Sequence, residues 1–139
     1  MMPMMDQEEG GGSKIKSILI IDDEKDILDS LSGYLERNGY DVEAADNGAE
    51  GLRLVRDRRP DLVILDLMLP DIDGSDIAAR LLEDPLTSRI PIIFLTSIVR
   101  KSEQLKPRRV TKRCVVAKPC SPAEILGRVR SIIGPPRVS

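Results

Sequence analysis

Short apolar runs alternate along the chain with segments in which apolar residues recur every three or four positions. The runs are typical of strands buried on both faces, and the recurring pattern indicates amphipathic helices. Gly39, Pro60 and Gly134 mark the ends of three of the helical segments. The pattern predicts strands over 15–22, 41–46, 61–69, 91–97 and 114–119, and helices over 24–38, 48–59, 75–84 and 122–133.

The repeated order of strand then helix predicts the fold class. Apolar strands joined through helices favour a parallel sheet that is covered on both faces, so we expect an α/β, doubly wound, five-stranded parallel sheet. Residues 15–133 would form this domain, 1–14 a flexible N-terminal tail and 134–139 a C-terminal tail. Sheets of this kind bind ligands at the carboxyl ends of their strands.

The stretch between the fourth and fifth predicted strands departs from the pattern. Residues 97–113 contain Pro107, which the interior of a helix tolerates poorly. We therefore expect a short, broken or mobile helix there. Its basic residues are interpreted as a solvated face, with nucleic-acid binding as the weaker alternative; they are Arg108, Arg109, Lys112 and Arg113.

Length, charge and composition exclude several classes of protein. The 139 residues are enough for one domain with a real core, and the net charge of −2 gives no overall basic field for nucleic acid. Aromatic residues make up 2%, which does not support a base-stacking platform. Two cysteines are too few for a disulfide framework, and neither a membrane span nor a signal peptide is visible. We expect a cytoplasmic protein that does not bind a membrane.

Polar side chains gather where the predicted strands end. Asp66 lies inside the apolar stretch LVILDLMLPDIDG, and a charge in a buried strand needs a partner. The carboxyl ends of parallel strands share one edge of the sheet, so we expect these side chains to converge. They are Asp22 and Asp23 after the first strand, Asp66 in the third, Thr96 and Ser97 at the end of the fourth, and Lys118 in the last.

Three ionised carboxylates at one edge repel one another and need a compensating cation. Their oxygen donors suit Mg²⁺, while the absence of histidine argues against zinc. With Mg²⁺ present, a carboxylate can attack a phosphoryl group and become an acyl phosphate. This chemistry favours Asp66 as the nucleophile, Asp22 and Asp23 as metal ligands, and Lys118 as the cation that neutralises the phosphoryl oxygens. The hydroxyl of Thr96 can hydrogen-bond the product.

Simpler interpretations stay open for some of these residues. Asp22 and Asp23 could cap the helix that follows them. Asp71 and Asp73 are interpreted as solvated acids of a turn and not as ligands. Cys114 and Cys120 are interpreted as ordinary small residues that flank the fifth strand.

Four motifs in order, LIIDDE, LVILDLMLPDIDG, PIIFLTS and AKP, resemble the receiver domain of two-component response regulators. The resemblance covers residues 15–133. It implies the (βα)₅, flavodoxin-like receiver fold with strand order 2-1-3-4-5. It also implies Mg²⁺-dependent transfer of a phosphoryl group to Asp66 from a histidine kinase or a histidine phosphotransfer protein.

The resemblance implies a metal site. Asp23 and Asp66 would bind Mg²⁺ directly, together with the main-chain carbonyl of Met68, and Asp22 would assist partly through water. Met68, two residues after Asp66, occupies a position whose side chain tends to influence dephosphorylation in receivers. Its apolar side chain cannot orient an attacking water, so we expect a longer-lived phosphoryl group.

The resemblance also implies a switch. Lys118 would pair with the phosphoryl oxygens, its bond to Pro119 is usually cis in this family, and Thr96 would move toward the phosphoryl group. Ser97 would keep the site compact. Receivers usually carry an aromatic residue three positions before the lysine, and Val115 stands there, which alters the usual coupling to the threonine.

Together these features predict a single-domain response regulator and not an enzyme with an external substrate. The chain ends soon after its last predicted helix, so we expect no attached DNA-binding module. Phosphorylation would switch the binding of a protein partner, through residues 98–113, 114–119 and 122–133, in a monomer or weak dimer. The alternative is a phosphorylation-independent pseudo-receiver or scaffold, and a phosphatase is weaker because Met68 replaces the second acid it would need.

Overall fold

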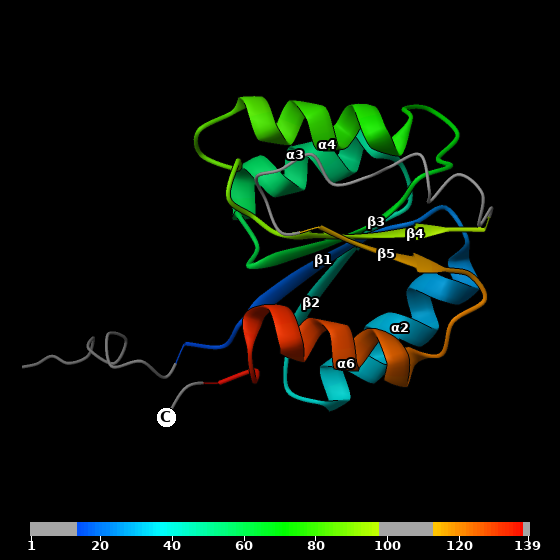
Figure 1. The fold of residues 1–139 in the computed structure, drawn as a ribbon, viewed down its shortest axis with the longest axis vertical. Helices are drawn as coiled ribbons and strands as arrows, with labels where there is room; N and C mark the ends of the chain where they lie inside the picture. The colour runs from blue at the N-terminus through cyan, green and yellow to red at the C-terminus, as the bar shows by residue number, and fades with distance from the viewer. Residues whose placement is uncertain (1–13, 98–112, 138–139) are drawn as a thin grey trace, which may run out of the picture.

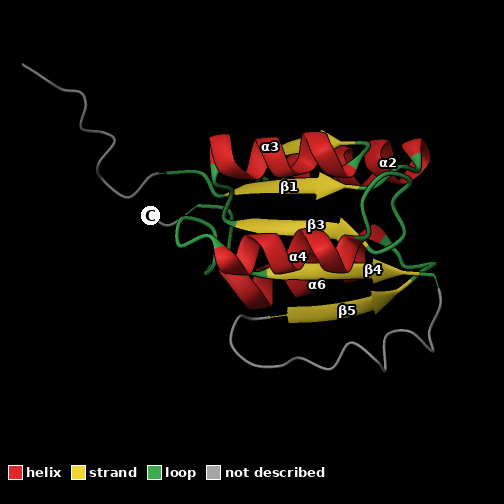
Figure 2. Cartoon of the chain, turned by 90° about the horizontal axis from the view of Figure 1, so that it is seen from above, coloured by secondary structure: helices red, strands yellow, loops and turns green. Residues whose placement is uncertain are grey.

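The computed structural model describes residues 14–97 and 113–137, and this part of the chain forms a three-layer α/β domain. Five parallel strands lie in the order β2-β1-β3-β4-β5, which confirms the predicted fold class and strand order. All arrows run the same way, with α3 and α4 on one face of the sheet and α2 and α6 on the other (Figures 1 and 2). The strands are β1 (Ser17–Ile21), β2 (Asp41–Ala45), β3 (Leu62–Asp66), β4 (Ile92–Thr96) and β5 (Arg113–Ala117). The helices are α2 (Lys25–Arg37), α3 (Gly48–Arg58), α4 (Gly74–Glu83) and α6 (Pro122–Ile133).

Each face of the sheet has its own hydrophobic core. Along β1, Ile18 and Ile20 pack toward α2 and α6, while Leu19 and Ile21 pack toward α3 and α4. This division follows from the two-residue period of a strand. Every residue of β3 and β4 is buried, which explains why these strands appear in the sequence as continuous apolar runs.

The predicted irregular helix between β4 and β5 lies outside the described residues. Within the described part of the chain, no helix has the length and apolar character that a membrane crossing requires.

Residues 134–137, which we predicted as part of a C-terminal tail, contact the body of the domain. The amino group of Lys16 donates to the carbonyl of Ile133 at 2.6 Å, and the hydroxyl of Tyr40 donates to the carbonyl of Gly134 at 2.7 Å. Ile15 and Arg137 form an antiparallel bridge, so both ends of the described chain lie side by side (Figure 1). These backbone contacts leave no periodic pattern in the sequence.

The start of α3 receives a cap from a distant loop. Asp71 accepts hydrogen bonds from the backbone N–H groups of Gly48 at 2.8 Å and Ala49 at 3.0 Å. These bonds to Gly48 and Ala49 hold the pKa of Asp71 below its usual value. Asp71 is exposed, as expected for a solvated acid of a turn, and it also caps a helix, which we did not predict. Asp73 is exposed and makes no side-chain cap bond.

Gly74 allows the start of α4 to contact the end of β3. A Cβ atom at this position would lie 2.6 Å from the carbonyl oxygen of Asp66 and 2.7 Å from the Cα of Leu67. The N–H of Gly74 also donates to the carbonyl of Leu67 at 3.1 Å. A residue without a side chain is thus required where the helix meets the strand that carries Asp66.

Replacing Asp71 with alanine should lower the free energy of unfolding at neutral pH, because two N–H groups at the start of α3 lose their acceptor. The pKa of Asp71 in the folded protein lies below its ordinary value of 3.8. The contribution of Asp71 to the free energy of unfolding is therefore complete above pH 3.8 and is lost as the pH falls through the folded-state pKa. Urea unfolding over a pH series should show the variant and the wild type converging in acid. Asp73→Ala is the matched control, and equal losses in both variants at neutral pH would contradict the capping role.

Replacing Gly74 with alanine should destabilise the domain by about 1–3 kcal/mol, because the added methyl group meets backbone atoms that cannot turn aside. Gly127→Ala is the control. There the Cβ would meet no heavy atom within 4 Å. Urea unfolding should rank Gly74→Ala as the less stable variant, and the reverse order would refute the close approach of α4 to β3.

Candidate functional site

The carboxyl edge of the sheet gathers the polar residues that the sequence singled out. Asp22 directly follows β1, Asp66 ends β3, Thr96 ends β4 and Lys118 directly follows β5. The strand register sets Asp66 beside Leu95, and the backbone N–H of Lys118 donates to the carbonyl of Thr96 at 2.7 Å. Residues that are far apart in the sequence therefore meet at one edge.

Three acids form a compact cluster. Asp22, Asp23 and Asp66 each offer a carboxylate oxygen, and these three atoms lie within 4.8 Å of one another. The exposed fraction is 0% for Asp22 and 4% for Asp66, whereas Asp23 is exposed to solvent. The cluster thus has two buried carboxylates and one that faces water.

Asp22 connects the cluster to the start of α2. Its Oδ1 accepts a hydrogen bond from the N–H of Glu24 at 2.9 Å. Its Oδ2 lies 3.0 Å from Nζ of Lys118, yet this buried oxygen accepts no hydrogen bond of good geometry. Glu24 itself is the N-cap of α2 and makes no side-chain cap bond. Asp22 therefore supports the turn before the helix, while one of its oxygens keeps spare acceptor capacity.

Lys118 is shared among three carboxylates. Its Nζ lies 3.0 Å from Asp22, 3.2 Å from Glu24 and 3.6 Å from Asp66. Burial lowers the pKa of this amine, but pairing with Asp22, Asp66 and Glu24 outweighs burial, and the net pKa is raised. The ammonium form is thus favoured. The bond from Lys118 to Pro119 is cis, which is the geometry that the resemblance implied.

Asp66 lies in an environment that disfavours its charge. Burial raises its pKa, and the nearby charges of Asp22 and Asp23 act in the same direction. The backbone N–H of Met68, 3.1 Å from Oδ1, and the ammonium of Lys118 oppose this rise. The net pKa is raised, so an additional cation at this edge would favour the ionised carboxylate.

The residues at this edge fit a hard divalent cation. Every donor in the three-acid cluster is a carboxylate oxygen, which suits Mg²⁺ better than zinc. The spare acceptor capacity of Asp22 Oδ2 is consistent with a further positive ligand. Mg²⁺ usually takes one or two carboxylates and keeps several waters, and exposed Asp23 leaves the cluster open to solvent. A role for the Met68 carbonyl stays a prediction.

The remaining candidate residues differ in exposure. Thr96 is fully buried at the end of β4, whereas Ser97 is exposed. Met68 is 47% exposed and lies two residues beyond Asp66. Val115 is partly buried and packs against the core on the α3 and α4 side. Its side chain thus belongs to that core.

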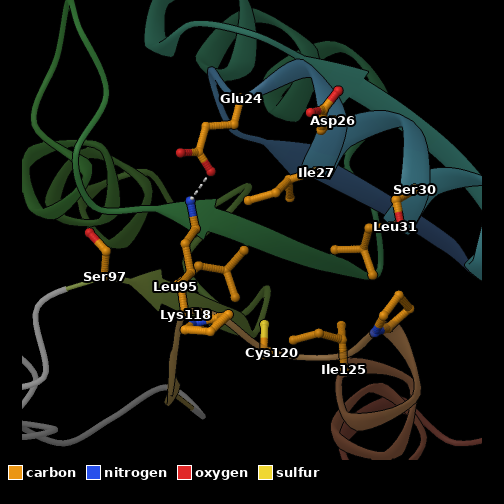
Figure 3. Close-up of a pocket in the computed structure, with 12 residues that line it drawn as sticks. Glu24, Asp26, Ile27, Ser30, Leu31, Leu95, Ser97, Lys118, Cys120 and Ile125 are labelled. Carbon is orange, nitrogen blue, oxygen red and sulfur yellow. Dashed lines mark hydrogen bonds and ion pairs between the residues drawn. The ribbon is translucent and has the colours of Figure 1, made fainter.

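A groove that sequence reasoning missed opens beside the site. It encloses about 650 Å³ between α2, the ends of β4 and β5, and the start of α6. Ile27, Leu31 and Ile125 give it an apolar wall, and Glu24 and Lys118 also line it (Figure 3). The sequence contains one signal for Glu24, since this residue directly follows the acid pair. The groove has no local signal, because its walls come from distant segments.

The comparison with known proteins agrees with the fold. A family model described as response regulator receiver domain matches residues 18–130. The phosphate regulon transcriptional regulatory protein PhoB of Pseudomonas aeruginosa is 37% identical over 118 residues, which are 85% of this chain and 52% of that protein. The chain thus spans about half the length of this relative.

Two further relatives match over most of their own length. Protein PilH of Pseudomonas aeruginosa is 30% identical over 116 residues, which are 84% of this chain and 96% of PilH. A crystal structure of a CheY-like response regulator receiver domain protein from Methanospirillum hungatei JF-1 superimposes with a TM-score of 0.73 at 28% identity, covering 85% of this chain and 93% of that one. With the parallel sheet, its strand order and the acids at its carboxyl edge, these matches show that the chain belongs to the response regulator receiver domain family.

Proposed function

We propose that this receiver domain accepts a phosphoryl group on Asp66 in a Mg²⁺-dependent reaction, with a phosphorylated histidine of a kinase or phosphotransfer protein as the donor. One observation carries the proposal: Asp66 is a buried carboxylate that shares a cluster with Asp22 and Asp23 and lies 3.6 Å from Nζ of Lys118. A nucleophile, a candidate metal site and a cation thus occur together.

In the proposed reaction, a carboxylate oxygen of Asp66 attacks phosphorus, the P–N bond to the donor imidazole breaks, and its electron pair returns to the ring nitrogen. Bound Mg²⁺ would neutralise charge on the transferring phosphoryl oxygens. Asp22 and Asp23 would hold that ion, and Lys118 would pair with a phosphoryl oxygen. The acyl phosphate stays on the chain until water cleaves it, so the domain is a phosphoacceptor and not an enzyme with an external substrate.

The proposed output is a change in affinity for a protein partner. Phosphorylation adds negative charge and strong acceptor oxygens beside Lys118 and Thr96. The backbone hydrogen bond from Lys118 to Thr96 joins the ends of β4 and β5. A movement of one of these residues would therefore displace the other. Population shift between two arrangements would then alter the face formed by β5 and α6.

A phosphorylation-independent scaffold is the second candidate. One observation favours it: Val115 is partly buried against the core at a position where receivers usually carry an aromatic residue. The acid cluster favours the first candidate, because a scaffold has no need for a buried carboxylate, Asp66, whose charge the neighbouring acids disfavour.

Asp66→Asn should abolish phosphorylation by acetyl phosphate in the presence of Mg²⁺, because an amide cannot serve as the nucleophile. Intact-mass spectrometry should show the phosphorylated species for the wild type and not for the variant. Chelation of Mg²⁺ should remove the signal from the wild type. Asp73→Asn, which changes an exposed acid outside the cluster, should behave like the wild type. A wild type that stays unmodified, together with unchanged partner binding in Asp66→Asn, would favour the scaffold.

Met68→Asn should shorten the lifetime of the phosphorylated protein by about two- to tenfold, the range expected when one hydrogen bond orients the attacking water. The apolar side chain of Met68 cannot supply that bond. Decay can be followed by phosphate-affinity gels after removal of the donor. Met68→Leu is the matched control and should decay like the wild type. Equal lifetimes in all three proteins would exclude a role for this position.

A further inference from the structure

We propose that Glu24 is a positioning residue that restrains Lys118 and competes with the phosphoryl group for its ammonium. The inference rests on the proposed function and adds a residue to it. Oε1 of Glu24 accepts a hydrogen bond from Nζ of Lys118 at 3.2 Å. The same Nζ lies 3.6 Å from Asp66, so Lys118 is closer to Glu24 than to the proposed phosphoacceptor.

The position of Glu24 on its helix supports this role. Glu24 is the N-cap residue of α2, a position that favours serine, threonine, aspartate or asparagine. Its side chain makes no cap bond and extends toward Lys118, as the dashed line in Figure 3 shows. The side chain therefore does not serve the helix that begins beside it.

Lys118 holds its carboxylate partners unequally. The side chain of Asp22 is 0% exposed, whereas that of Glu24 is 58% exposed. Breaking the pair with Asp22 would leave a buried charge unpaired, which is costly, while Glu24 can exchange Lys118 for water. When phosphoryl oxygens need the ammonium, Glu24 is therefore the partner that Lys118 leaves. The pair with Glu24 stabilises the donor-free state relative to the phosphorylated state.

Glu24→Gln should increase the initial rate of Asp66 phosphorylation by acetyl phosphate, measured at Mg²⁺ concentrations that saturate each protein. The expected increase is about two- to fivefold, the range that corresponds to one exposed ion pair. Added salt should bring the wild-type rate toward that of the variant, because ions screen an exposed pair.

Asp26→Asn is the matched control. Asp26 lies in the first turn of α2, is exposed and lines the same groove. The described ion pairs of Lys118 are with Asp22, Glu24 and Asp66, and not with Asp26. Asp26→Asn thus removes one nearby negative charge and leaves the pair between Glu24 and Lys118 in place. The rate of Asp66 phosphorylation in this variant should stay close to that of the wild type.

Two readouts separate positioning from a structural role. The ¹⁵N resonance of the Lys118 ammonium, recorded without donor, should move in Glu24→Gln and stay in place in Asp26→Asn. Glu24→Ser provides a good helix cap without a carboxylate. It should unfold no earlier than the wild type in a thermal scan and still be phosphorylated faster.

The outcomes distinguish the two proposals. Equal rates for the wild type and Glu24→Gln would overturn the restraint and leave Asp66 as the phosphoacceptor. An equal increase in Asp26→Asn would overturn it as well, because general charge would then explain the effect. Absence of phosphorylation in the wild type and in every variant would instead overturn the proposed function, and the restraint with it.

Discussion

The structure depends on how it accommodates buried carboxylates at the end of a hydrophobic sheet. Asp22 and Asp66 are almost fully buried, and the negative charges of Asp22 and Asp23 raise the pKa of Asp66. A buried charge is tolerated only when it is paired and hydrogen-bonded. Lys118 supplies the pairing for both, and the backbone N–H groups of Glu24 and Met68 supply hydrogen bonds. Lys118, directly after β5, is thus what allows Asp22 after β1 and Asp66 at the end of β3 to be buried.

The two hydrophobic cores keep this arrangement in place. Residues of β3 and β4 are buried on both faces of the sheet, so the strand ends cannot move apart to relieve the repulsion between carboxylates. The close approach of Gly74 to the backbone of Asp66 holds the end of β3 from a second direction. Packing of the two cores thereby stabilises an edge at which clustered buried carboxylates are unfavourable by themselves. Proteins commonly offset local strain at functional sites in this way.

The parallel sheet and the acids at its edge could be predicted from the sequence, because each leaves a local pattern. Strands buried on both faces leave continuous apolar runs, and the acid inside one of them, Asp66, has no structural explanation without partners. The cap from Asp71 to Gly48 could not be predicted, because it joins residues that are 23 positions apart through a loop. The contact between Glu24 and Lys118 also depends on tertiary structure, since the helix position of Glu24 suggests a cap that the side chain does not make.

In the proposed mechanism, the unequal sharing of Lys118 would give the site its capacity to respond. An ammonium held by one buried carboxylate alone would resist displacement, because the unpaired charge left behind is costly. An ammonium held only by exposed carboxylates would be poorly positioned, since such pairs are weak. Lys118 has one partner of each kind, Asp22 and Glu24, and a longer contact to Asp66. In this mechanism the buried pair would fix the position of the lysine, and the exposed pair would decide how readily it turns toward new negative charge at Asp66.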